Sequence, residues 1–140
     1  MKIKRICFCV NNLKKIKEII YISKQNNIFP IIYIKYYLTK GFGLEWITSL
    51  DFILSKSFKK NSYELFVDAN RDHGLSIELI KNRIKYIKIK CNPIIFDKIT
   101  KIAKKNKVLL NPPFHIVDLS NIKNIKRKLS LMILRIKNEN

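Results

Sequence analysis

The chain has 140 residues, with 29 Lys and Arg against 10 Asp and Glu, and a formal net charge of +19. Its 47% of hydrophobic residues exclude a disordered polyelectrolyte and suit one domain spanning residues 1–140. No apolar run approaches the roughly 20 residues of a membrane-spanning helix, so we expect no transmembrane segment. The first ten residues lack the apolar core of a secretory leader, and three cysteines give no disulfide framework. We therefore expect a cytoplasmic protein.

Short apolar runs alternate with longer segments of helical spacing from one end of the chain to the other. Five strands are predicted, at residues 6–10, 31–36, 63–69, 86–91 and 108–110. The first helix begins at Leu13 and ends before Asn26, a turn is predicted over 39–43, and further helices follow over 44–54, 75–84, 93–103 and 122–136. The start signals are an Asn-Pro pair at residues 92–93, Asp72 before the third helix and Ser120 before the last.

This alternation of strand and helix predicts an α/β fold with a mainly parallel, five-stranded sheet flanked by helices. A doubly wound sheet with helices on both faces, in the flavodoxin-like order 2-1-3-4-5, fits the length, and a half β/α barrel is the second choice. The fourth strand conflicts with the first choice, because Lys88 and Lys90 alternate with apolar residues. A central parallel strand should be apolar on both sides, so this strand lies at an edge or has one face without a helix.

Candidate site residues are those at the carboxyl ends of the strands, where open parallel sheets bind ligands. The densest polar group follows the third strand, between Asp68 and Gly74. The predicted ligand-binding residues are Asn11, Asn12, Asp68, Asn70, Asp72, His73, Gly74 and Asn92. The alternative for several of them is a structural role, since Asp and Asn are the usual helix-capping residues and Asp72 is placed to cap the third helix.

The function expected from this site is binding of a small anionic ligand or a metal, and a minimal enzyme using Asp68 or Asp72 as acid or base is an alternative. His73 and His115 follow the third and fifth strands, but their spacing matches no metal motif, so no metal ligand is assigned. The chain has only three glycines and no glycine-rich phosphate loop, which argues against a dinucleotide cofactor. The three cysteines are predicted to be buried, small apolar residues.

The distribution of charge suggests a second function. Residues 41–80 carry six acids and four bases, whereas residues 81–140 carry sixteen bases and three acids, so the carboxyl-terminal half is strongly basic. Association with RNA or the ribosome through this half is therefore the alternative function. Ile, Lys and Asn, whose codons are rich in A and T, make up 64 of the 140 residues, so drift in an A/T-rich genome accounts for part of the charge.

Overall fold

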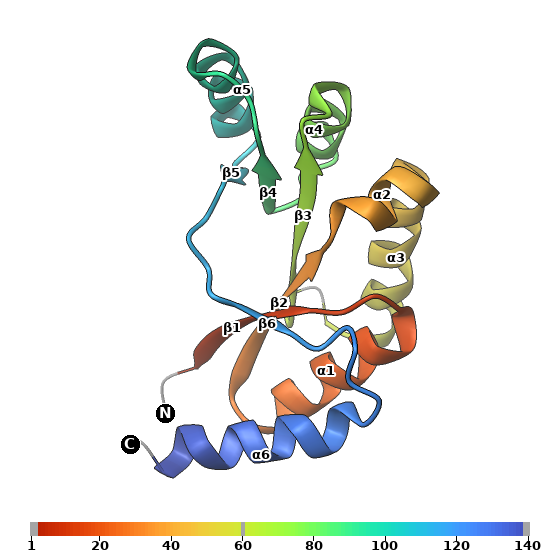
Figure 1. Cartoon of the computed structure of the whole chain (residues 1–140). Helices are drawn as coiled ribbons and strands as arrows, with labels where there is room; N and C mark the ends of the chain where they lie inside the picture. The colour runs from red at the N-terminus through yellow and green to blue at the C-terminus, as the bar shows by residue number, and fades with distance from the viewer. Residues whose placement is uncertain (1–2, 60, 139–140) are drawn as a thin grey trace.

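The computed structural model describes residues 3–59 and 61–138, and its strands form one parallel sheet (Figure 1). The strands are β1 (Lys4–Cys9), β2 (Ile28–Ile34), β3 (Glu64–Asn70), β4 (Tyr86–Ile89), β5 (Leu109–Leu110) and β6 (Ile116–Asp118). The helices are α1 (Leu13–Gln25), α2 (Tyr36–Phe42), α3 (Leu44–Ser57), α4 (His73–Lys81), α5 (Pro93–Lys105) and α6 (Ile125–Asn138). The α/β class and the parallel sheet predicted from the sequence are confirmed.

The strand number and order differ from the first prediction. The sheet has six strands in the order β5-β4-β3-β2-β1-β6, not five in the order 2-1-3-4-5. The additional strand, β6, pairs with β1 over only three residues, too few to show a periodicity in the sequence. Because each of the first five strands is added on the same side of its predecessor, right-handed crossovers carry every connecting helix to the same face of the sheet.

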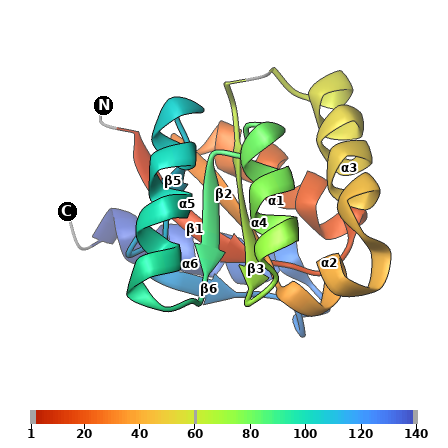
Figure 2. The ribbon, with the colours of Figure 1, turned by 90° about the horizontal axis from the view of Figure 1, so that it is seen from above.

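The two faces of the sheet are covered differently. One face packs against the helices through a large core that includes Phe8, Ile32 and Val67, and Figures 1 and 2 show the helices along this outer side. The other face carries a separate apolar cluster around Phe66 and Tyr86, to which no described helix contributes. The expectation of helices on both faces is therefore wrong, and the arrangement is that of the second choice, a half β/α barrel.

A short connector requires the sheet to curve. Residues 111–115 join β5 to β6, which lie at opposite edges of the sheet. The extended chain from Leu110 to Ile116 reaches about 21 Å, less than the roughly 24 Å that five strand spacings would span in a flat sheet. The connector crosses the face that bears no helix, where Phe114 packs edge-on against Phe66 and Tyr86. We call this face the concave face.

The concave face also explains the alternation in the fourth strand. Tyr86 and Lys88 point to this face, whereas Ile87 and Ile89 point into the helix-side core. Without a helix above it, the half-buried Lys88 side chain reaches solvent over the aromatic cluster. Both options left open by the sequence apply in part, since β4 also has only the two-residue β5 between it and the edge.

Two local predictions are wrong. The turn expected at residues 39–43 lies mostly within α2, and the break between α2 and α3 is at Gly43, whose φ of 80° favours glycine. The last helix begins at Ile125 rather than after Ser120, because Asn124 accepts a hydrogen bond from the backbone N–H of Arg127 and caps it. The hydroxyl of Ser120 instead donates to Asp118.

Candidate functional site

Charged and hydroxyl side chains lie together at the carboxyl edge of the concave face. They come from β2, β3, β4 and β6, and from Lys35, which directly follows β2. Side chains alternate along each strand, so the residues two positions beyond the aromatic layer return to the same face. We call this group the carboxyl-edge cluster: Tyr33, Lys35, Asp68, Lys88 and Asp118. Asp118 pairs in register with Cys9, and Asp68 with Lys88, which places the group along one rim of the sheet.

A hydrogen bond between Tyr33 and Asp68 forms the centre of the cluster. The Tyr33 hydroxyl donates to Oδ2 of Asp68 at 2.7 Å, and the backbone N–H of Asn70 donates to Oδ1 at 2.8 Å. Burial, followed by the hydrogen bond to Asp68, raises the pKa of Tyr33 well above its usual range. Tyr33 therefore keeps its proton at neutral pH and acts as a donor that orients the carboxylate.

Asp118 is held by a second set of contacts at the same edge. Its Oδ1 accepts from the hydroxyl and the backbone N–H of Ser120, and its Oδ2 lies 3.2 Å from Nζ of Lys35. The Ser120 hydrogen bonds, with a smaller contribution from Lys35, lower the pKa of Asp118 from 3.8 to about 2. In return the hydrogen bond that Lys35 donates to Asp118 raises the pKa of Lys35, so this pair is ionised at neutral pH.

These contacts predict a pH-dependent contribution to stability. The folded-state pKa of Asp118 lies below its ordinary value, so its contribution is complete above pH 3.8 and is lost as the pH falls through about 2. The side chain is about half exposed, so we expect D118N to lower the free energy of unfolding at pH 7 by about 1 kcal/mol. Urea unfolding at pH 7 and pH 2 measures this, and the two proteins should converge at pH 2.

Asp97 provides the control for this prediction. It forms an exposed ion pair with Lys101 one turn along α5 and makes no other described contact. D97N should change the free energy of unfolding by about 0.5 kcal/mol or less at either pH. A D118N protein that is as stable as the parent at pH 7, or that remains less stable at pH 2, would contradict the assigned role of Asp118.

Lys88 differs from the other charged members of the cluster. Its Nζ lies 6.0 Å from the centroid of the Tyr33 ring, and no carboxylate within the described residues forms an ion pair with it. Lys88 lines a cavity of about 220 Å³ whose other walls come from β3, β4, the connector and β6. The cavity residues are Phe66, Lys88, Ile89, Asn111, Pro112, Phe114 and Ile116. The cavity therefore combines one ammonium group with mainly apolar walls.

Three of the residues predicted for ligand binding have a structural role. Asn12, Asp72 and Asn92 accept hydrogen bonds from the backbone N–H groups of residues 15, 75 and 95, at 2.9, 3.0 and 2.9 Å, and so cap α1, α4 and α5. Such a cap typically stabilises a protein by about 1 kcal/mol. The capping role that the sequence offers as the alternative for these residues is thus present at all three.

The other predicted residues lie at the same edge of the sheet but not in one group. Asp68 belongs to the carboxyl-edge cluster, and the backbone of Asn70, with φ of 51°, forms the irregular end of β3 beside β4. Asn11 and His73 are half-buried, and Oδ1 of the first and Nε2 of the second are buried without a hydrogen-bond partner among the described residues. Gly74 lies in the first turn of α4, where an added Cβ would meet only ordinary contacts.

Sequence reasoning missed four members of the cluster: Tyr33, Lys35, Lys88 and Asp118. A signal for Lys88 was present in the alternation of the fourth strand, where a lysine on one face indicated an edge strand or a face without a helix. Asp118 had no such signal, because the three-residue β6 that positions it has no detectable pattern. Lys35 was assigned to the interior of a strand that in fact ends at Ile34.

The cysteines of β1 lie on the concave face and are buried as predicted. Burial raises the pKa of Cys9 to about 11 and that of Cys7 to about 12. Both thiols are therefore protonated at neutral pH and are poor nucleophiles. Cys91, which is half-buried, packs against the helix-side core.

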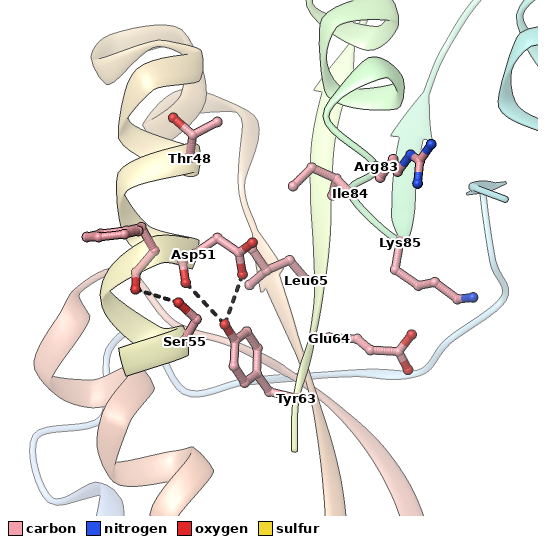
Figure 3. Close-up of a pocket in the computed structure, with 10 residues that line it drawn as sticks. Thr48, Asp51, Ser55, Tyr63, Glu64, Leu65, Arg83, Ile84 and Lys85 are labelled. Carbon is pink, nitrogen blue, oxygen red and sulfur yellow. Dashed lines mark hydrogen bonds between the residues drawn. The ribbon is translucent and has the colours of Figure 1, made fainter. Parts of the chain in front are cut away.

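A larger groove, of about 460 Å³, lies at the opposite edge of the sheet (Figure 3). It runs between α3 and the start of β3, and its best-defined contact is the Tyr63 hydroxyl, which donates to Oδ1 of Asp51 at 2.9 Å. Arg83 and Lys85 lie on its far side. Ligands of parallel α/β proteins bind at the carboxyl ends of strands, and this groove lies at the amino end, so the carboxyl-edge cluster is the stronger candidate.

Comparison with known proteins leaves the site to be interpreted from its own geometry. Neither the protein-family models nor the curated proteins give a match to this chain. In the described part of the chain, no three His, Cys, Asp or Glu side chains gather in a way that could hold a metal ion. Within residues 3–59 and 61–138, no helix combines the length and apolar content that crossing a membrane requires.

Proposed function

We propose that the protein binds a small anionic ligand in the cavity beside Lys88, at the carboxyl ends of the strands. The observation that carries the proposal is that some charged groups at this edge have a partner within the protein and one does not. Asp68 is hydrogen-bonded to Tyr33 and Asp118 is paired with Lys35, whereas the half-buried ammonium of Lys88 faces a cavity with no carboxylate partner among the described residues. A carboxylate or phosphate oxygen would satisfy that ammonium in a site partly screened from water.

The walls of the cavity indicate the kind of anion. Phe66, Phe114 and Ile116 provide apolar contacts, and the volume of about 220 Å³ is below the usual range for drug-sized ligands. These features suit a small organic acid or a small phosphate ester with an apolar part. The predicted binding of a metal has no support here, because no three His, Cys, Asp or Glu side chains of the described residues gather in a way that could hold an ion.

Catalysis by Asp68 is the less favoured alternative. Both of its carboxylate oxygens accept hydrogen bonds within the protein, from Tyr33 and from the backbone of Asn70. Asp72 has a capping role at the start of α4. An acid or base would have to give up these contacts to exchange a proton with a substrate, so the arrangement supports binding better than chemistry.

A thermal-shift screen tests the proposal, with inorganic phosphate, glycerol phosphate, succinate and citrate as probes and sodium chloride at equal ionic strength as the reference. We expect at least one probe to raise the melting temperature in a saturable way, as mass action requires. K88M should lower the affinity for that probe by about tenfold or more, the loss expected for a charge-assisted contact.

Lys90 gives a matched control, because it lies two residues further along the same segment and is exposed. K90M removes the same charge and should bind the probe within about twofold of the parent protein, since exposed charges are strongly screened. The proposal fails if none of the four probes produces a shift beyond that of sodium chloride, or if K88M binds as well as K90M.

Association with RNA is the second candidate, as the basic carboxyl-terminal half suggests. The cationic side chains of α5 and α6 are exposed. These two helices lie at opposite ends of the helix layer, α5 beside α4 and α6 beside α1 (Figure 1). Positive surface charge spread over both helices would attract a polyanion in a salt-dependent manner. RNA binding measured over a series of salt concentrations tests this candidate function.

A further inference from the structure

A groove of about 610 Å³ lies where α1 meets the segment that leads into α6. Its floor is apolar and its walls are polar and cationic. The lining residues are Glu18, Tyr21, Ile22, Gln25, Lys123, Asn124, Ile125 and Lys126. Ile22 and Ile125 are buried in the helix-side core and fix the position of the two segments. The groove is therefore a surface feature on a rigid base.

Tyr21 is the distinctive residue of this groove. Tyr21 is 58% exposed, on a helix on which Ile16, Ile19 and Ile20 are fully buried. It makes no ring contact or hydrogen bond within the described residues, so nothing in the fold requires an aromatic side chain at this position. No local pattern joins this aromatic side chain to the basic residues, since more than a hundred positions separate Tyr21 from Lys123.

The charge around the ring is strongly positive. Lys123 and Lys126 line the groove, and α6 continues with Arg127 and Lys128, all exposed. Residues 121–138 contain no acidic side chain, and Glu18 is the single carboxylate of the groove. An exposed aromatic face between cationic side chains is the arrangement by which proteins hold single-stranded nucleic acid, with a base stacked on the ring and phosphates beside the lysines.

We propose that the groove between α1 and α6 binds single-stranded RNA, with a base stacked on Tyr21 and the phosphates contacted by Lys123 and Lys126. This inference rests on the second candidate function and gives it a location. Because stacking and phosphate contacts do not read sequence, binding should depend little on base order.

Fluorescence anisotropy with an end-labelled oligouridine tests the inference on the full chain. Y21A should weaken binding by about tenfold, the loss of one stacked base, whereas Y21F should bind like the parent. The double variant K123A/K126A should weaken binding and reduce the slope of log affinity against log salt by about 1.4, the value for two phosphate contacts on a single strand. Circular dichroism melting checks that each variant is folded.

Two controls remove the same groups elsewhere. Tyr37 is as exposed as Tyr21 but lies on α2, and Lys104 and Lys105 are exposed on α5. Y37A and K104A/K105A should bind within about twofold and threefold of the parent, respectively. If they weaken binding as much as the groove variants, RNA association stands but this location is wrong. If the parent protein does not bind the oligouridine, or prefers a duplex, the inference is wrong; the anion site at Lys88 is tested separately and is unaffected.

Discussion

Replacing Phe66 with alanine should lower the free energy of unfolding by about 3–5 kcal/mol, the cost of removing a large buried aromatic side chain. Phe66 is 2% exposed and lies at the centre of the concave face. Its ring contacts those of Tyr33, Tyr86 and Phe114, at centroid distances of 5.0, 6.3 and 6.0 Å. Since single domains are stable by only about 5–15 kcal/mol, the loss is a large fraction of the total.

The same substitution should free the connector from the sheet. No helix covers the concave face in the described structure, so the packing of Phe114 on Phe66 and Tyr86 is the main apolar contact that holds residues 111–115 there. We therefore expect faster amide hydrogen exchange at Ile116 and Val117 in F66A than in the parent protein. Chemical denaturation followed by circular dichroism gives the stability change.

Phe52 is the control for this prediction, because it is 61% exposed on α3, where its ring lies beside the Lys56 ammonium. F52A should cost less than about 1 kcal/mol. An F66A protein that loses no more stability than F52A would show that the concave face is not a second core, and the candidate site would then have no fixed base.

The sequence was informative where a feature is local. Alternation of strands and helices predicted the α/β class, and Asn92 before Pro93 predicted the cap of α5, because both depend on residues within one or two turns of each other. Strand order depends on which side of the preceding strand each new strand is added. No short sequence pattern records that choice. The one indication in the sequence was the alternation at Lys88, which predicted a strand at an edge of the sheet or one with a face that no helix covers.

The candidate site was harder to predict than the fold for the same reason. Asp68 could be nominated because it ends a clear strand, but its partner Tyr33 was hidden in an apolar run as an ordinary strand residue. Asp118 was out of reach, since it is positioned by a three-residue strand at the far end of the chain. Polar caps such as Asn12 and Asp72 attract attention in a sequence, whereas the groups that face a cavity are distributed over strands that meet only in the fold.

Replacing Asn111 with alanine should also destabilise the protein, by about 2–3 kcal/mol. The backbone N–H of Asn111 donates to the carbonyl of Ile87 as the last bond between β5 and β4, and Pro112 then directs the chain away. The side-chain amide replaces the missing peptide group: its Oδ1 accepts from the N–H of Ile89 at 2.7 Å, and its Nδ2 donates to the carbonyl of Ile89 at 3.1 Å. An alanine leaves the backbone N–H and C=O of Ile89, which is 3% exposed, without these partners.

Backbone strain adds to this cost, because Asn111 has φ of 49°, a conformation that asparagine tolerates better than alanine. N111G separates the two effects, since glycine relieves the strain but does not restore the hydrogen bonds. N111G should therefore recover about 1 kcal/mol of the free energy of unfolding relative to N111A. Asn121, exposed and without a described hydrogen bond, is the control, and N121A should stay within about 0.5 kcal/mol of the parent in urea unfolding. If N111A behaves like N121A, the amide does not extend the sheet, and the wall that Asn111 gives to the Lys88 cavity is not held by β4.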